Sequence, residues 1–154
     1  MINVSQMEFV FNMSVFSFLH NEKHKFLPLK VKEIEAAEQR LETKFPAELR
    51  QFYVEIGYGF ANRNETTAFQ LIIDLESAVD LHLREDFYES DPDLDTYDER
   101  EGFIFFEVVE GWYFEVRWGT EDASLVYFMD TRIADSLQAF FEQLDNDTNF
   151  YEKC

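Results

Sequence analysis

The sequence predicts an α+β fold, in which a mainly antiparallel sheet carries an N-terminal helical hairpin and a C-terminal helix. Three stretches predict this class. Residues 33–60 place apolar residues at helical spacing on both sides of a proline, residues 103–119 have the pattern of a β-hairpin, and residues 133–144 carry another helical stripe. A chain of 154 residues is long enough to bury a sizeable core, and we expect one domain over residues 1–154.

The first 28 residues are expected to form an N-terminal arm. Apolar and polar residues partly alternate over residues 7–18, which favours a strand or an extended segment. Residues 20–32 hold the one basic stretch of an acidic chain, with Lys23, Lys25, Lys30, Lys32, His20 and His24. We interpret it as a solvated linker leading to a proline. A phosphate contact and an internal partner for an acidic loop are the alternatives.

Residues 33–60 predict two helices joined at a proline. The first helix places Ile34, Ala37 and Leu41 on one face. Pro46 begins the second helix, because proline is tolerated in the first helical turn and not further in. Glu48 then suits the positive end of the helix dipole. The apolar stripe of the second helix is Leu49, Phe52, Tyr53 and Ile56, and Gly57 and Gly59 end it.

Residues 69–83 predict a short strand followed by a helix. The strand covers residues 69–73, and the carboxylate of Asp74 is placed to cap the helix. One face of that helix carries an apolar stripe that includes His82. We interpret His82 as a packed, hydrogen-bonded side chain, because no second His or Cys lies at metal-ligand spacing.

Residues 74–101 hold twelve acidic and two basic side chains. Alternate aspartates resemble a calcium loop, but Thr96 and Gly102 stand where an EF-hand loop needs Gly and Glu. A solvated acidic loop is one interpretation, and a recognition surface for a basic protein is the other. Because tyrosine is favoured among charges at interfaces, the predicted partner contacts are Tyr88, Asp91, Asp93, Asp95 and Tyr97.

Residues 103–119 predict a β-hairpin with a two-residue turn at Glu110 and Gly111. Unbroken pairing from that turn gives one apolar face, in which Val109 lies opposite Trp112, Glu107 opposite Phe114, Phe105 opposite Val116 and Phe103 opposite Trp118. The opposite face mixes apolar and charged residues, and we expect an arm or a partner to cover part of it. Tyr113 and Arg117 on that mixed face are therefore further predicted contacts.

The remaining residues predict a third strand over residues 125–129 and a closing helix. Asp130 or Thr131 is expected to cap this helix, whose stripe is Ile133, Leu137, Phe140, Phe141 and Leu144. Residues 145–154 are expected to be a frayed tail. The residues expected to be buried are Phe52, Ile56, Phe105, Trp112, Phe114, Leu137 and Phe140.

Charge and motifs restrict the function. A net charge of −19 opposes binding to nucleic acid or anionic membranes and favours a basic partner. Cys154 has no partner for an intramolecular disulfide, no signal peptide is recognisable, and no apolar run approaches the roughly 18 residues of a transmembrane span, so we expect a cytoplasmic protein. Because phosphate-loop, nucleophile-elbow and zinc-protease motifs are absent, we expect no cofactor, no metal and no enzyme activity.

The helical hairpin also resembles the N-terminal signature of the SUKH superfamily. That signature is an E-x-x-L, an apolar residue with Pro, an acidic residue, a Leu-x-x-Phe run and a Gly, here Glu38, Leu41, Phe45, Pro46, Glu48, Leu49, Phe52 and Gly57. The string IADSLQAFFEQL is similar to the closing helix of the same family. Members often carry Asn-Gly-Gly after the hairpin, where this chain has Gly57, Tyr58 and Gly59, so this loop is expected to differ in shape.

The resemblance implies two functions for a single SUKH-like domain. Bacterial members of the family are immunity proteins, which implies that this chain binds and neutralises a contact-delivered toxin, often a nuclease, by stoichiometric occlusion. The fungal members imply a regulatory protein-interaction scaffold of the cell-wall-regulator type. A carboxylate-based enzyme is a third alternative, since 32 acidic residues always offer pairs. The expected partner is a toxin with a basic surface.

Overall fold

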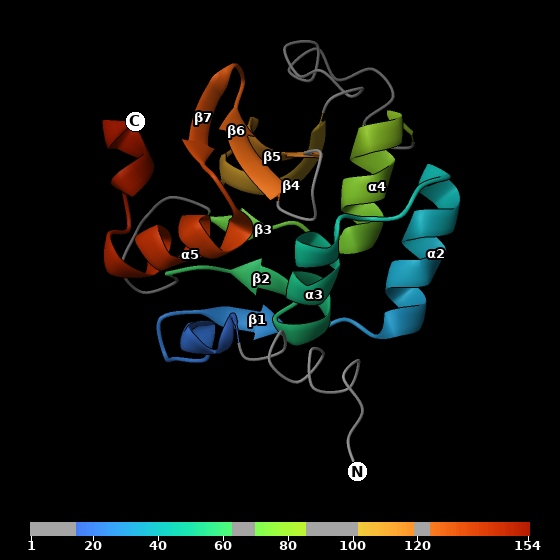
Figure 1. Ribbon diagram of the computed structural model, residues 1–154, viewed down its shortest axis with the longest axis horizontal. Coiled ribbons are helices and arrows are strands. Elements are labelled where there is room, and N and C mark those ends of the chain that lie inside the picture. Colours follow the sequence, from blue (N-terminus) through green and yellow to red (C-terminus); the bar gives the residue numbers. More distant parts are fainter. Residues whose placement is uncertain (1–14, 63–69, 86–101, 119–123) are drawn as a thin grey trace.

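The computed structural model describes residues 15–62, 70–85, 102–118 and 124–154. Its centre is one antiparallel sheet of seven strands whose order follows the chain, from β1 to β7 (Figure 1). The strands are β1 (Lys25–Leu27), β2 (Tyr58–Phe60), β3 (Leu71–Ile72), β4 (Gly102–Val109), β5 (Trp112–Trp118), β6 (Ser124–Phe128) and β7 (Thr131–Ala134). The predicted α+β class with a mainly antiparallel sheet is confirmed.

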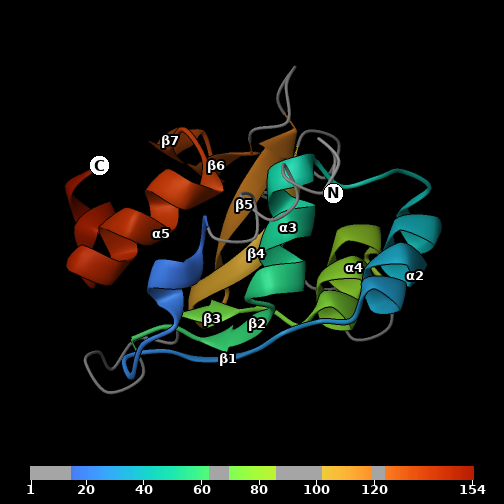
Figure 2. The ribbon, with the colours of Figure 1, turned by 60° about the horizontal axis from the view of Figure 1, so that its bottom comes forward.

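The helices divide into two groups along the sheet. The α-helices are α2 (Val31–Leu41), α3 (Ala47–Glu55), α4 (Leu75–Leu83) and α5 (Leu137–Asn146), and the short 3-10 helices are η1 (Ser17–Leu19) and η4 (Phe150–Lys153). In both ribbon views α2 and α4 lie side by side, and α3 stands between them and α5 (Figure 2). The helical hairpin and the closing helix are thus where the sequence pattern predicts them.

Side-chain caps decide where two of these helices begin. The Asp74 carboxylate accepts a hydrogen bond from the backbone N–H of Ser77 at 3.1 Å, which confirms the predicted cap of α4. The predicted cap of α5 is wrong. Ser136 caps it instead, accepting from the N–H of Ala139 at 3.0 Å, because Thr131 already belongs to strand β7.

Two carboxylates of the helical hairpin hold backbone groups in place. Glu38 is 8% exposed and its Oε2 accepts a hydrogen bond from the N–H of Phe45 at 2.8 Å. Glu48 reaches further and accepts from the N–H groups of Ser124 at 3.0 Å, Leu137 at 2.9 Å and Gln138 at 3.2 Å. A negative charge at the N-terminus of α5 also suits the dipole of that helix. Glu48 therefore joins α3 to β6 and α5.

The core is a cluster of phenylalanine rings between the helices and strands β4 and β5. Phe140 of α5 packs within 6 Å, between ring centroids, of five other rings, which belong to Phe105, Phe106, Phe114, Phe141 and Phe150. Phe141 stacks on Phe52 of α3 at 4.5 Å. Six of the seven residues expected to be buried are at most 2% exposed, and the exception is Trp112 at 55%.

The register of the β4–β5 hairpin differs from the prediction. The Glu110–Gly111 turn and the pairing of Val109 with Trp112 are confirmed, but two register shifts follow. Phe106 pairs with Phe114 and Phe103 with Val116, because β4 contains one additional residue at each shift. Such bulges change which side chains point inward. Both faces of β4 are buried over most of its length.

Two glycines allow strand β2, which follows the helical hairpin, to lie close to β1. Gly59 has φ +136, and a Cβ placed on it would meet the backbone carbonyl of Lys25 in β1. Gly57 is equally close to Leu27, at φ +93. The two strands β1 and β2 can pair because these positions carry no side chain. The sequence pattern did not predict β1, β2 or β7.

Both described ends of the chain pack on the core. Phe16 is fully buried with its ring 5.1 Å from Phe52, and residues 17–19 form a 3-10 helix. The strand or extended arm expected over residues 7–18 falls mostly on residues 7–14, which lie outside the described part of the chain. At the other end, Phe150 is 6% exposed and the Tyr151 ring lies 5.3 Å from that of Phe114. Two aromatic side chains of the segment expected to be a frayed tail, Phe150 and Tyr151, thus contact the core.

Candidate partner-binding surface

The seven predicted contact residues fall into two groups. Five of them lie in residues 86–101, outside the described part of the chain, and these are Tyr88, Asp91, Asp93, Asp95 and Tyr97. The alternate aspartates that resemble a calcium loop lie in the same segment, outside the described residues. Tyr113 and Arg117 lie in β5 and can be placed.

Tyr113 offers little surface to a partner. Its side chain is 5% exposed, and its backbone pairs with Glu107 of β4. Burial raises the pKa of the Glu107 carboxyl above its usual range. The N–H of Gly111 and the hydroxyl of Tyr113 oppose this change in pKa by hydrogen bonding, and the charge of Glu110 adds to it. Tyr113 therefore binds the Glu107 carboxylate, which in turn accepts a hydrogen bond from the N–H of Gly111 in the β4–β5 turn.

Arg117 holds three elements together. Its Nε donates to Oε1 of Glu115 at 2.9 Å, and Glu115 is 1% exposed. Its Nη2 donates to the carbonyl oxygen of Met129 at 2.6 Å, in the turn between β6 and β7. The guanidinium carbon also lies 4.0 Å from the centre of the Tyr127 ring, a cation–π distance. Arg117 thus fixes the β6–β7 turn against β5.

Beside this support lies an exposed apolar surface that the sequence pattern did not predict. Trp112 is 55% exposed, Val109 39% and Met129 37%, and Phe128 is half-buried. The Trp112 and Phe128 rings are stacked, with centroids 5.5 Å apart and planes at 15°. We call Val109, Trp112, Phe128 and Met129 the aromatic patch. It joins the β4–β5 turn to the β6–β7 turn.

Trp112 is exposed because it lies beyond the reach of α5. Phe140 covers Phe114, two residues along β5, with ring centroids 5.6 Å apart. The Trp112 ring packs on Phe128 instead. The signal for this surface in the sequence is a Trp directly after a two-residue turn. A strict alternation of inward and outward side chains assigns that Trp to the core.

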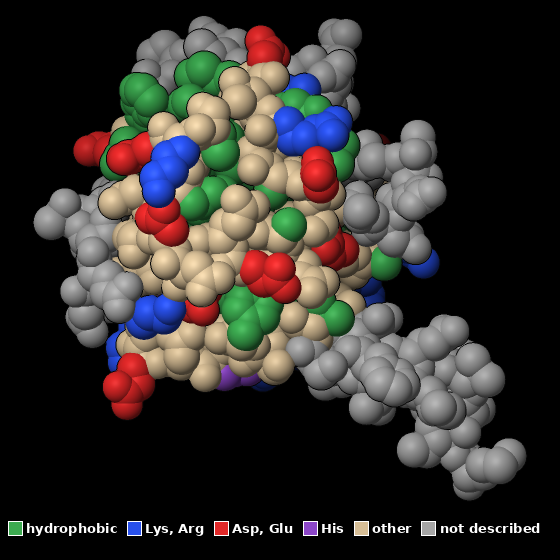
Figure 3. Space-filling model, turned by 60° about the vertical axis from the view of Figure 1, so that its left-hand side comes forward, with side chains coloured by type: hydrophobic (Ala, Val, Ile, Leu, Met, Phe, Trp, Pro, Cys, Tyr) green, Lys and Arg blue, Asp and Glu red, His purple; other side chains and the backbone are tan. Residues whose placement is uncertain are grey.

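Acidic side chains lie in both turns that carry the aromatic patch. Glu110 and Asp130 are exposed in the two turns, and Asp135 is exposed after β7. Arg132 forms an ion pair with Asp135 at 3.3 Å and lies 5.8 Å from the centre of the Tyr127 ring. On the face in Figure 3, a group of hydrophobic side chains lies at the upper left, and side chains of both charges lie near it and over the rest of the face. The rim of the patch is therefore net acidic.

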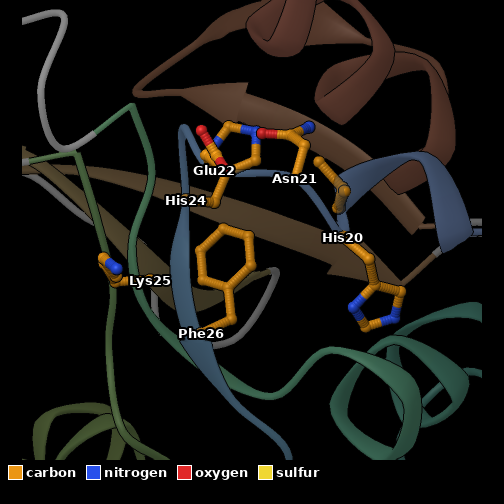
Figure 4. Close-up of a pocket in the computed structure, with 7 residues that line it drawn as sticks. His20, Asn21, Glu22, His24, Lys25 and Phe26 are labelled. Atoms are coloured by element: carbon orange, nitrogen blue, oxygen red, sulfur yellow. The ribbon is translucent and has the colours of Figure 1, made fainter.

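Two residues of the basic stretch, Lys23 and His24, have partners within the fold. His24 lies stacked on Phe26 at 5.1 Å, while His20 points away (Figure 4). The Nε2 of His24 lies 2.9 Å from Oδ1 of Asp145, and the Nδ1 of His24 accepts a hydrogen bond from the N–H of Asn62 at 3.0 Å. Lys23 binds the same carboxylate at 2.9 Å. The acidic partner of this stretch is thus the end of α5.

No metal or membrane site emerges from the part of the chain that the structure describes. Within it, no three His, Cys, Asp or Glu side chains are grouped so that they could hold a metal ion. His82 packs against Phe103 with ring centroids 5.6 Å apart, as predicted for a structural histidine. None of the described helices has the length and apolar character needed to span a bilayer.

The chain forms a small α+β domain with an exposed aromatic patch. It consists of a helical hairpin held by the Glu38 and Glu48 carboxylates, a seven-stranded antiparallel sheet and a closing helix. The chain belongs to the SUKH family, whose model with the description SMI1-KNR4 cell-wall matches residues 31–141. The predicted family is thereby confirmed. The match spans Glu38 and Glu48, so the acidic positions of the signature are those that cap backbone groups.

A relative is known from Bacillus subtilis (strain 168). The protein called Immunity protein YxxD is 35% identical to this chain over 133 residues, which cover 85% of this chain and 90% of that protein. No solved structure matches this chain.

Proposed function

We propose that this chain is an immunity protein that binds a contact-delivered bacterial toxin with nuclease activity and neutralises it in the cytoplasm. The observation that carries the proposal is the 35% identity to a protein named as an immunity protein, over 85% of the chain. Membership of the SUKH family supports it. The net charge of −19 is also suited to a partner with a basic, phosphate-binding surface.

The mechanism is stoichiometric occlusion without turnover. A nuclease carries cationic groups where phosphates bind, and an acidic protein that covers them competes with the nucleic acid. Opposite charges also raise the association rate, which matters when a toxin must be captured before it acts.

The test titrates the purified chain against the nuclease activity of a toxin domain, which is sought in the genes adjacent to the gene of this chain. Inhibition is expected to be complete at a one-to-one ratio. A chain that inactivates many toxin molecules would be an enzyme, and a chain that binds without inhibition would be a regulatory scaffold. The scaffold is the second candidate, because the description of the family model refers to the cell wall.

Within this proposal the acidic segment of residues 85–101 supplies part of the contact. Twelve acids lie within residues 74–101, and a basic partner relieves their mutual repulsion. The test compares binding kinetics of the wild type with Asp91→Asn/Asp93→Asn/Asp95→Asn and, separately, with Tyr97→Ala. The triple variant is expected to slow association at low salt, and Tyr97→Ala to speed dissociation. Unchanged rates in both variants would leave this segment as solvated surface only.

A further inference from the structure

We infer that the aromatic patch is the apolar centre of the toxin interface and docks on a partner surface whose apolar hollow is ringed by Lys and Arg. The inference rests on the proposed function and deepens it, because it assigns contact residues within the described part of the chain. The partner is a protein and not a membrane, since the acidic rim opposes an anionic lipid surface.

The first argument is the state of Trp112. Tryptophan is the residue type most enriched among interface residues that dominate binding energy. Here more than half of the side chain is exposed, yet the ring is held by stacking on Phe128 at 5.5 Å. A side chain that is already oriented loses little conformational freedom when it binds. The stack therefore presents Trp112 in a form ready for contact.

The second argument is the backbone at Met129. This residue has φ +53, in the left-handed region that favours glycine and is unfavourable for a long side chain. The residue is nevertheless 37% exposed and is not one of the buried core residues. A turn chosen for stability alone would carry Gly or Asn at this position. Methionine adds an adaptable apolar surface beside the Trp112 ring instead.

The third argument is rigidity and charge. Arg117 fixes the turn by donating to the Met129 carbonyl at 2.6 Å, while the Tyr127 ring lies against the same guanidinium. The exposed rim carries Glu110 and Asp130, of which Asp130 lies 3.8 Å from Arg117 and is fully exposed. A rigid apolar centre with an acidic rim is complementary to an apolar hollow among basic side chains.

The experiment measures toxin binding by surface kinetics and the melting temperature of each variant. Trp112→Ala is expected to weaken binding by roughly 30-fold or more, mainly through faster dissociation. Met129→Gly is expected to weaken binding about 3- to 10-fold while the melting temperature stays equal or rises, because glycine relieves the positive φ. This second variant separates loss of contact from loss of folding.

Matched controls and outcomes complete the test. Leu27→Ala removes an equally exposed apolar side chain, 60% exposed on strand β1, and is expected to bind as the wild type does. Glu110→Gln/Asp130→Asn is expected to slow association at low salt and leave dissociation unchanged. Wild-type affinity in both Trp112→Ala and Met129→Gly would overturn the patch assignment while toxin binding itself stands. A wild type that fails to bind the toxin would instead overturn the proposed function.

One other occupant of the patch is tested directly. Sedimentation of the free protein is expected to show a monomer. A dimer that Trp112→Ala converts to monomer would assign the patch to a second copy of this chain and overturn the inference.

Discussion

Glu48 of α3 accepts a hydrogen bond from the backbone N–H of Leu137, the first residue of α5, at 2.9 Å. The two residues are 89 positions apart, and the same carboxylate also accepts from Ser124 and Gln138. An acidic residue that appears from the sequence to suit only its own helix dipole thus connects the start of the fold to its end.

Glu48→Ala is expected to lower the free energy of unfolding by roughly 2–3 kcal/mol, because three backbone donors lose their acceptor. Chemical denaturation measures the change. The matched control is Glu35→Ala on α2, where the carboxylate is 62% exposed and the change is expected to stay within about 0.5 kcal/mol. Equal stability of the two variants would contradict the connecting role of Glu48.

Phe140→Ala is expected to cost about 3–5 kcal/mol, since five rings lose their common neighbour. Thermal unfolding monitored by circular dichroism measures it. Leu27→Ala on the exposed face of β1 serves as the comparison and is expected to change little. A Phe140→Ala protein that melts with the wild type would refute the placement of α5.

Tyr53→Phe is expected to leave stability unchanged or raise it by up to about 1 kcal/mol. The Tyr53 hydroxyl is fully buried and has no hydrogen-bond partner within the described ranges. Burial, helped by the charge of Asp74, raises the pKa of this hydroxyl far above its usual range. Tyr151→Phe is the opposite case, because its hydroxyl accepts from Gln70 at 3.2 Å, and a loss of about 1 kcal/mol is expected. A clear loss in Tyr53→Phe would reveal a partner for its hydroxyl.

The Asp145 carboxylate is expected to make stability depend on pH. Burial alone would raise its pKa, but hydrogen bonds from Lys23, His24 and Asn21 together lower that pKa below the usual range. A lowered pKa in the folded state gives a contribution to stability that is complete above the unfolded value, about 3.9, and is lost as the pH falls through the folded pKa.

Unfolding free energies of wild type and Asp145→Asn, measured from neutral pH downward, test this. The difference between them is expected to shrink as the pH falls below about 4. Asp135→Asn changes an exposed carboxylate, 82% accessible, and is expected to follow the wild-type curve. A constant difference between wild type and Asp145→Asn at every pH would contradict the role of the carboxylate charge.

Local patterns in the sequence predict local structure well. The stripe from Leu49 to Ile56 and the Asp74 cap each depend on neighbours within one or two helical turns, and both are confirmed. The pairing of Val109 with Trp112 across the Glu110–Gly111 turn is equally local. These features follow from periodicity and turn chemistry, which a single sequence displays.

Features that depend on distant residues were not predictable. The β4–β5 bulges leave no mark in the alternation of apolar and polar residues, so regular alternation gave the wrong register. The same alternation placed Trp112 in the core, although its ring packs on Phe128 and is exposed. Lys23 and His24 read as a solvated linker because Asp145 lies 121 residues from His24. The aromatic patch joins two turns that only the completed sheet brings together, and the contacts predicted in residues 86–101 lie outside the described residues.

Strand order has a consequence for synthesis on the ribosome. Because every strand pairs with the strand before it in the chain, the sheet can grow by one strand at a time as the polypeptide emerges. The closing helix is the exception, since Phe52 and Glu48 acquire Phe141 and Leu137 only after residues 137–141 have left the exit tunnel. Until then Phe52 has its contact with Phe16 but lacks the stacked ring of Phe141. Emergence of residues 137–141 is therefore the step that completes the packing of α3 against α5.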